Sequence, residues 1–321
     1  MPRGPRLDTP GTLHHVMIRG IDRGSIVQDD MDRNEFLKRM GMLAKETATA
    51  IYAFALMNNH AHILLKSGPG GLPTYMRRFL SGYAQYFNRR HKRVGHLFQN
   101  RYKSIICEEE AYFDKLVAYI HLNPLRAGQV ETLEQLASYP MSGHAALMGK
   151  LSYEWMDSDY VLQFFGNSAG KARQAYLDYL EEEMGVDREK ELTRGGLVRS
   201  HGGWSKVQSM RRRRDKVLSD ERILGGNDFV KEVLKEAEER KEVVLPELER
   251  LQLFDDEIEQ ACESAGVTVT FLRSGSKIGQ LPSLRKKLAR KAVCEYGISL
   301  AETGRKLGVT TNAVSFMLRN A

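Results

Sequence analysis

The chain has 321 residues, a formal net charge of +7 and a sequence pI of about 9.2. Its content of 42% hydrophobic and 28% charged residues, without an apolar run near the ~20 residues of a membrane span, excludes a membrane protein and predicts two or three globular domains. The N-terminus lacks the apolar core of a secretory signal, and Cys107, Cys262 and Cys294 are scattered and odd in number, so we expect a cytoplasmic protein.

Positive charge is concentrated in two separate parts of the chain. Residues 1–143 hold 19 Lys and Arg against 13 Asp and Glu, and residues 280–321 hold 8 against 2. Residues 144–279 are acidic, with 21 against 26. Two basic modules indicate a polyanionic partner, and nucleic acid is preferred to a membrane because no amphipathic membrane helix stands out. We therefore expect a protein associated with the nucleoid.

Strand and helix patterns alternate along the first 90 residues in the order β-α-β-β-α. Strands are expected at 11–20, 51–57 and 58–66, and helices at 29–48 and from 72 to about 90. Intermixed strands and helices with a hairpin-like strand pair predict an α+β fold with a mainly antiparallel sheet.

The remainder of this first domain, expected to span residues 1–148, is an extended segment at 96–107 and a helix at 109–123 ended by Pro124. Charged helical segments then dominate residues 149–279, which predicts an acidic, all-helical middle region. Its run RRRR at 211–214 fits either a phosphate contact or, more commonly, a solvated helix face.

Residues 280–321 have the pattern of three helices. A basic helix opens at Pro282, Ser299 begins an S-x-x-E capping box for a second helix, and Thr310 or Thr311 caps a third. The pattern predicts a helix-turn-helix that binds duplex DNA, although an ordinary three-helix end cap has the same spacing. Three polar residues of the third helix could face base edges: Thr311, Asn312 and Ser315.

The stretch NNHAHILLK places His60 and His62 two residues apart on an expected strand. Residues i and i+2 of a strand point to the same face, so the two imidazoles can share one metal ion. Histidine pairs on strands also occur without a metal. A metal site therefore needs a third ligand.

The helix before Pro124 offers that ligand. Tyr119 and Asn123 are four residues apart and share a helical face, so a tyrosine hydroxyl and an amide oxygen can reach the same site. Two nitrogens and an amide oxygen leave open positions for phosphate oxygens, which suits Mg²⁺ or Mn²⁺ better than a closed zinc site. The alternative is a core tyrosine and an asparagine that merely ends the helix.

Several sequence motifs together resemble those of the REP-associated tyrosine transposases. These belong to the single-tyrosine branch of the HUH endonucleases, which are named after a His-U-His motif in which U is a bulky apolar residue. The motifs in this chain are GTLHHVMIRGIDR, DRNEFL, NNHAHILLK, YIHLNPLRAG and YPMSGHAALMG, within about residues 9–148. Ala61 is smaller than the usual U residue. The C-terminal segment from Leu284 to Leu318 also resembles the duplex-binding domain of bacterial replication initiators.

The resemblance implies a role for each matching residue. Tyr119 would attack a phosphodiester of single-stranded DNA to form a 5′-phosphotyrosine, and His60, His62 and Asn123 would hold the divalent ion. The implied partners are single-stranded and hairpin DNA from short palindromic repeats. A phenol with a pKa near ~10 is a poor nucleophile, so a metal that polarises the phosphate is a reasonable requirement.

A basic, aromatic-rich segment is the candidate surface for DNA, because cations contact the backbone and flat side chains stack on bases. Its cationic residues are Arg78, Arg89, Arg90, Lys92, Arg93, Arg101 and Lys103. Two other functions stay open: a DNA-binding regulator that no longer uses its catalytic domain, and a metallonuclease that activates water and does not need Tyr119. The sequence leaves the oligomeric state open.

Overall fold

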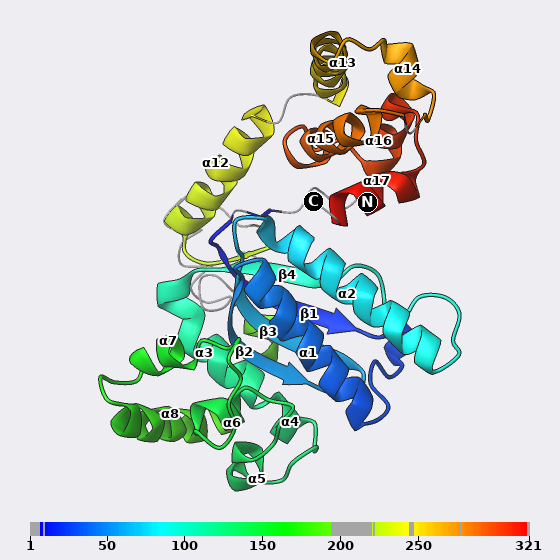
Figure 1. The fold of residues 1–321 in the computed structure, drawn as a ribbon. Coiled ribbons are helices and arrows are strands. Elements are labelled where there is room, and N and C mark those ends of the chain that lie inside the picture. The colour runs from blue at the N-terminus through cyan, green and yellow to red at the C-terminus, as the bar shows by residue number, and fades with distance from the viewer. Residues whose placement is uncertain are drawn as a thin grey trace. The chain divides into compact units, whose positions relative to one another are not determined.

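The computed structural model describes residues 7–8, 10–193, 220, 222–243, 247–276 and 278–319 (Figure 1). The chain divides into two compact units, residues 1–237 and 238–321. The RRRR run at 211–214 lies outside the described residues. Among the described helices, none has the length and apolar character needed to cross a membrane.

A five-stranded sheet of order β2-β3-β1-β4-β5 forms the centre of the first unit. Pairing is antiparallel between β2 and β3, β3 and β1, and β1 and β4, whereas β4 and β5 are parallel. The strands are β1 (Leu13–Arg19), β2 (Ala50–Leu56), β3 (His60–Lys66), β4 (Lys103–Cys107) and β5 (Ile223–Leu224). The expected α+β class and the β-α-β-β-α order are confirmed.

Two details differ from the sequence prediction. The segment 96–107 is extended only at Lys103–Cys107, and an isolated bridge between Gly20 and Phe98 is the pairing before it. The middle region is not entirely helical, because its residues Ile223 and Leu224 form β5. This short strand forms because it pairs with Ile106 and Cys107 at the edge of the sheet. Such a long-range pairing leaves no signal in the hydrophobic periodicity of the segment itself.

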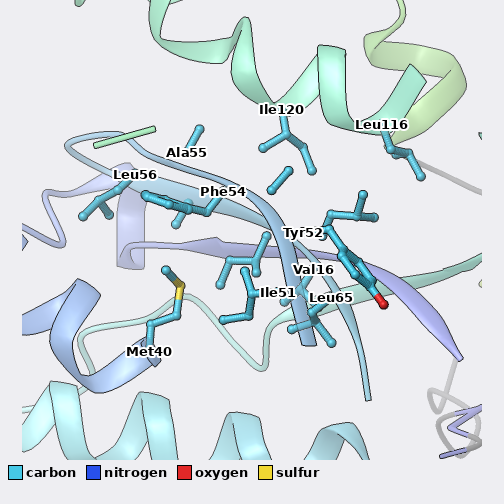
Figure 2. Packing of buried hydrophobic residues seen from close by; sticks show 14 of the residues in the cluster. Val16, Met40, Ile51, Tyr52, Phe54, Ala55, Leu56, Leu65, Leu116 and Ile120 are labelled. Carbon is cyan, nitrogen blue, oxygen red and sulfur yellow. The ribbon is translucent and has the colours of Figure 1, made fainter. Parts of the chain in front are cut away.

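Helices cover both faces of the sheet (Figures 1 and 2). Helices α1 (Asp30–Glu46) and α2 (Gly71–Arg90) lie on one face, and α3 (Glu109–His121) lies on the other. In Figure 2, Met40 approaches the strands from α1, while Leu116 and Ile120 approach from α3. All three side chains are fully buried, so each helix presents its apolar face to the sheet, as the three-and-four-residue spacing predicts.

Part of the predicted middle region packs in the same core as the sheet. Ala172, Tyr176, Leu180 and Leu192 are fully buried members of that core. The hydroxyl of Tyr176 is 2.8 Å from Nδ1 of both His121 and His144, which ties three helices together. The helices after α3 in this unit are α4 (Asn123–Arg126), α5 (Leu133–Ala137), α6 (His144–Leu147), α7 (Ser158–Gln163), α8 (Ala169–Met184), α9 (Glu189–Leu192) and α12 (Asn227–Val243), the last of which crosses the unit boundary.

The second unit is helical and has its own apolar core, which includes Phe254, Leu272, Leu288, Leu307 and Val314. This core joins residues on both sides of position 280. The domain boundaries expected after residues 148 and 279 stay a prediction. The helices are α13 (Glu247–Ser264), α14 (Val269–Arg273), α15 (Leu281–Cys294), α16 (Leu300–Leu307) and α17 (Thr311–Arg319).

The ends of the last two helices are set by short-range chemistry. The hydroxyl of Ser299 accepts a hydrogen bond from the Glu302 N–H at 3.1 Å and so caps α16, as predicted. Gly308 ends α16 with φ +68°, a conformation that favours glycine. Thr310 accepts from the Ala313 N–H at 3.2 Å at the start of α17. That helices α16 and α17 act as a DNA-binding helix-turn-helix stays a prediction.

Candidate active site

Strand β3 directs His60 and His62 toward helix α3. Alternation along the strand puts both on one face, and their ring centroids are 5.3 Å apart. The ring of Tyr119, in the last turn of α3, meets His62 edge-on at a centroid distance of 5.7 Å. The structure therefore brings together three residues that the sequence analysis selected, although nearly 60 residues separate the tyrosine from the histidines.

Both histidines use Nδ1 for a hydrogen bond. His60 Nδ1 lies 2.6 Å from the Asn59 Oδ1, an atom that only accepts, so His60 donates. His62 Nδ1 lies 2.9 Å from Nε2 of His15 on the neighbouring strand β1. Within the described part of the chain, Nε2 of His60 and Nε2 of His62 have no hydrogen-bond partner. Two imidazole nitrogens with this arrangement suit a metal ion.

Burial keeps these imidazoles neutral. It lowers the pKa of His60 to about 4, with a further contribution from the positive charge of Arg19. It lowers the pKa of His62 well below its ordinary value, with smaller contributions from His15 and His60. The pKa of His15 is lowered to about 4, again mainly by burial. Neutral imidazole is the form that binds metals, so the site is ready for a cation near pH 7.

Asn123 begins helix α4, one turn beyond Tyr119. Its Nδ2 donates to the Tyr119 carbonyl at 2.8 Å, which commits the amide nitrogen and leaves the amide oxygen as an acceptor. Pro124 cannot donate a backbone hydrogen bond, which separates α4 from α3 at Leu122. Asn123 thus has the donor chemistry of the third ligand that the sequence analysis requires.

Among the described residues, no group of three or more His, Cys, Asp or Glu side chains could hold a metal ion. A metal at β3 would therefore depend on oxygen donors other than carboxylates, with Asn123 as the protein's candidate. Two imidazoles and one amide oxygen leave several coordination positions for phosphate and water. This donor set fits Mg²⁺ or Mn²⁺, which keep water and phosphate oxygens in their coordination shell.

Two residues beside the predicted set were missed by the sequence analysis. His15 contacts both His62 and Tyr119, with its ring centroid 5.9 Å from that of the tyrosine. The Arg126 guanidinium carbon lies 5.5 Å from the Tyr119 ring centroid, and its Nη2 donates to the carbonyls of Glu183 at 3.1 Å and Val186 at 2.9 Å. The spacing of seven residues from Tyr119 to Arg126 is a helical signal that could have indicated Arg126.

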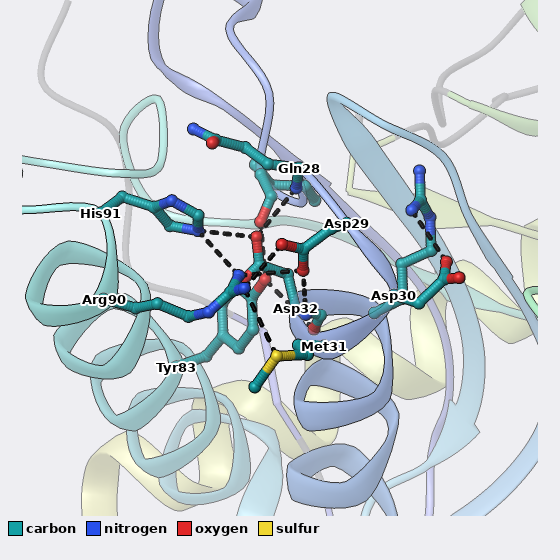
Figure 3. A network of polar contacts seen from close by, with 10 residues as sticks. Gln28, Asp29, Asp30, Met31, Asp32, Tyr83, Arg90 and His91 are labelled. Atoms are coloured by element: carbon teal, nitrogen blue, oxygen red, sulfur yellow. Dashed lines mark hydrogen bonds and ion pairs between the residues drawn. The ribbon is translucent and has the colours of Figure 1, made fainter.

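Two of the seven predicted cationic DNA contacts are already paired within the fold. Arg78 forms an ion pair with Glu46. Arg90 contacts Asp29 at 2.6 Å and Asp32 at 2.7 Å in the network of Figure 3. These guanidinium groups hold α1 and α2 together, so a role in DNA binding would compete with their ion pairs.

The other five cations are accessible to different degrees. Arg89, Lys92 and Arg101 are exposed and form no ion pair with another described residue. Arg93 lies over the Phe87 ring at 5.6 Å, and Lys103 donates to the Thr193 carbonyl at 2.5 Å. Arg89, Lys92 and Arg101 are therefore the predicted cations that are best placed to contact a phosphate.

A cavity of about 480 Å³ lies between α2 and the loop 95–102. Its walls are largely apolar, with Met76, Leu80 and Phe98 among them, and Arg77 and Arg101 also line it. Arg77 was not selected from the sequence. In the second unit, Thr311 and Asn312 are exposed on the first turn of α17, while Ser315 is half-buried.

The part of the chain that carries the site is similar to a known family. Residues 10–123 match the family described as IS200-like transposase, a range that contains His60, His62 and Tyr119 and ends at Asn123. A comparison with curated proteins gives no match. The chain is also similar to a solved structure of a REP-associated tyrosine transposase bound to a REP hairpin, at 14% identity and a TM-score of 0.40, covering 49% of this chain and 94% of that chain.

Residues 10–123, which carry the candidate site, are thus similar to the IS200-like transposases.

Proposed function

We propose that the protein cuts and rejoins single-stranded DNA through a covalent tyrosine intermediate and depends on a divalent metal. The observation that carries this proposal is the contact of Tyr119 with His62, 5.7 Å between ring centroids, where the His62 Nε2 has no described partner. A hydrolase that activates water does not need a tyrosine at that place. The match of residues 10–123 to a transposase family supports the same chemistry.

His60, His62 and Asn123 would hold the metal ion. When bound, the ion would withdraw charge from the scissile phosphate, which lowers the barrier to attack by a weak nucleophile. The protein's own contribution is to present neutral imidazoles and to keep Tyr119 close to them. Arg126 adds a positive charge beside the Tyr119 ring, which favours the phenolate that forms when the Tyr119 hydroxyl loses its proton.

The reaction needs no external energy source. The Tyr119 hydroxyl loses its proton to solvent and its oxygen bonds to phosphorus, while the bond from phosphorus to the 3′-oxygen breaks and that oxygen takes up a proton. The products are a 5′-phosphotyrosine and a 3′-hydroxyl. Attack by the 3′-hydroxyl of another strand on the phosphotyrosine reverses these steps, joins the strands and returns the phenol.

For the substrate, we propose strands that fold as hairpins, such as short repeated palindromes. The exposed Arg89, Lys92 and Arg101 can contact phosphates, and the cavity beside Arg101 has apolar walls suited to an unstacked base. The helices α15 to α17 would bind duplex DNA, with Thr311 and Asn312 toward base edges.

The catalytic proposal is tested with a labelled, repeat-derived hairpin strand and Mn²⁺, followed by denaturation to detect a protein–DNA adduct. We expect an adduct with the wild type, a loss of about a thousand-fold or more with Tyr119→Phe, and a comparable loss with His62→Ala. The matched control is Tyr112→Phe, which lies on the same helix, two turns from Tyr119.

Each contrary result has a definite meaning. Cutting that survives Tyr119→Phe contradicts the covalent mechanism and favours activated water. If the wild type binds the hairpin and Mn²⁺ but does not cut any of a panel of repeat-derived strands, a DNA-binding regulator is favoured.

Duplex binding is tested separately in the full chain with Thr311→Ala combined with Asn312→Ala. Deletion from residue 280 would divide the second core, so substitutions at exposed positions are preferred. We expect about ten-fold weaker duplex binding and unchanged hairpin cleavage, because one bidentate base contact is worth about 1–3 kcal/mol. Gln252→Ala combined with Gln260→Ala, both exposed on α13, is the control. An unchanged duplex affinity would contradict the role of α17.

A further inference from the structure

His15, one of the two histidines of β1, is buried between the proposed metal ligand His62 and the backbone of a distant helix. It is fully buried, and its ring stacks on His62 with centroids 5.2 Å apart. Its Nδ1 lies 2.9 Å from the Leu192 carbonyl oxygen, and its Nε2 lies 2.9 Å from His62 Nδ1. Both ring nitrogens of His15 therefore form hydrogen bonds, and His15 is the middle member of a chain of hydrogen bonds that links His62 to Leu192.

The direction of these hydrogen bonds follows from the acceptor at one end. A carbonyl oxygen can only accept, so His15 Nδ1 carries the proton in the bond to Leu192. A neutral imidazole has one N–H, so His15 Nε2 is an acceptor. His62 must then donate from Nδ1, which leaves a lone pair on His62 Nε2. The order is His62 to His15 to Leu192, with each group donating to the next.

We propose that His15 is a positioning residue that fixes the tautomer and the ring orientation of His62, so that His62 Nε2 is ready to bind the metal ion. The inference rests on the proposed function in taking His62 as a metal ligand. It goes beyond that function by assigning His15 and the Leu192 carbonyl to the site. A metal-binding histidine commonly donates its other N–H to an oriented acceptor, and loss of that acceptor weakens metal binding by about 10–100-fold.

The Leu192 carbonyl, the last acceptor in this series of hydrogen bonds, lies outside the residues that match the transposase family. Leu192 is the last residue of α9, 177 residues from His15, and the family match covers residues 10–123. Leu192 is also fully buried in the core of the sheet, which fixes the place of its carbonyl. The segment after the matched domain thus completes the support of His62, and the site depends on residues that the family motifs do not include.

A purely structural role for His15 predicts something different. If His15 only fills space against His62 and Tyr119, then phenylalanine, which is also flat and aromatic, should preserve the site. If His15 orders the proton of His62, phenylalanine should fail and glutamine should partly succeed. A glutamine side chain has an oxygen that can accept from His62 and an N–H that can donate to Leu192.

The test uses the full-length protein, labelled with ¹⁵N at histidine, and records the side-chain ¹⁵N shifts of His62 without metal. In the wild type we expect the proton on Nδ1. In His15→Phe we expect that preference to be lost and the affinity for Mn²⁺, measured by titration calorimetry, to fall about 10–100-fold. In His15→Gln we expect a smaller loss. The matched control is His14→Phe, which lies next in β1, is equally buried and points to the opposite face of the sheet.

The outcomes separate this inference from the proposed function. The inference is overturned if His62 of the wild type carries its proton on Nε2, or if a folded His15 variant keeps both the wild-type tautomer and the wild-type Mn²⁺ affinity. If His15→Phe does not fold, His15→Gln decides by the same two measurements. A lost tautomer preference with weakened Mn²⁺ binding supports the inference even if no strand is cut, in which case the proposed function alone fails.

Discussion

Two polar clusters, each with a buried member at its centre, lie on opposite faces of the same sheet and differ in how their charges are compensated. The ion cluster, Asp29, Asp32, Arg90 and His91, joins the start of α1 to the end of α2 (Figure 3). The histidine cluster, His15, His60 and His62, faces α3. Both are built from residues that are expensive to bury without partners, so the fold must compensate each in some way.

The ion cluster is compensated inside the protein. Asp32 accepts from Arg90 at 2.7 Å, from His91 at 2.8 Å and from the Gln28 N–H at 2.9 Å. The hydrogen bond from Arg90 lowers the pKa of Asp29 to about 2. Opposite charges stabilise this network, because both aspartates accept hydrogen bonds from the guanidinium of Arg90.

The histidine cluster is compensated only in part. Its Nδ1 atoms have acceptors, but Nε2 of His60 and Nε2 of His62 have no partner among the described residues. It holds no opposite charge, and burial favours the neutral forms instead. Buried, neutral imidazoles without an opposite charge, rather than the mere presence of polar residues, therefore distinguish the candidate site from the ion cluster.

The largest effect expected from this comparison is on stability. Asp32→Ala should lower the free energy of unfolding by about 3 kcal/mol, because Asp32 is the fully buried acceptor that joins the half-buried Arg90 and His91. Mn²⁺ affinity should be unchanged. Urea titration and calorimetry measure the two quantities. Asp30→Ala is the control, since Asp30 is exposed on the same helix and pairs only with Arg33 within the described chain. For this variant the free energy of unfolding should fall by less than about 1 kcal/mol.

The reciprocal change should affect the metal instead. His60→Gln should weaken Mn²⁺ binding by about 100-fold while changing the free energy of unfolding by less than about 1 kcal/mol, because His60 is half-buried and its one described hydrogen bond is to Asn59. His96→Gln, an exposed histidine of the loop 95–102, is the control. If His60→Gln were to destabilise the fold without changing Mn²⁺ affinity, the distinction between the clusters would fail.

A smaller effect is expected at Arg126, which holds a charge beside Tyr119 without belonging to either cluster. Arg126→Gln should slow adduct formation about two- to five-fold, because Arg126 is exposed and an exposed cation beside an aromatic ring contributes about 0.5–1 kcal/mol. Single-turnover rates at saturating Mn²⁺ measure it. Arg173→Gln is a matched control, since Arg173 also binds a backbone carbonyl, that of Leu147, away from Tyr119. Equal rates for Arg126→Gln and wild type would exclude an electrostatic role.

A separate effect concerns pH, and it tests whether buried neutral histidines cost stability in acid. Burial lowers the pKa of His144 to about 4 from 6.5. The unfolded chain then binds a proton that the folded chain does not between these values, so stability is fully present above pH 6.5 and is lost as pH falls toward 4. His144→Gln should reduce the slope of unfolding free energy in this window by up to about 1.4 kcal/mol per pH unit. A slope equal to that of the wild type would contradict this assignment.

Much of the candidate site could be predicted from local patterns. The two-residue period of a strand places His60 and His62 together, and the four-residue spacing on a helix relates Tyr119 to Asn123. Capping by Ser299 and the left-handed end at Gly308 follow from the same local chemistry. These predictions need only neighbours within about one helical turn or two strand positions.

Residues whose role depends on distant partners could not be assigned in this way. Arg90 looked like a DNA contact, but Asp29 and Asp32, some 60 residues earlier, already pair with it. Arg126 is held by carbonyls from the end of α8. A run of cations has the same sequence pattern whether its charges face solvent or another helix.

The sequence by itself determined the α+β class, the strand that carries the histidines and the helix that carries Tyr119, because hydrophobic periodicity and short motifs encode local structure. The tertiary structure decided which nitrogen of His62 is presented and which residue orients it. That decision depends on the antiparallel register of β1 with β3 and on the carbonyl of Leu192, 177 residues from His15. Contacts of this kind arise only when the chain has packed, since no local pattern specifies a partner so far along the chain.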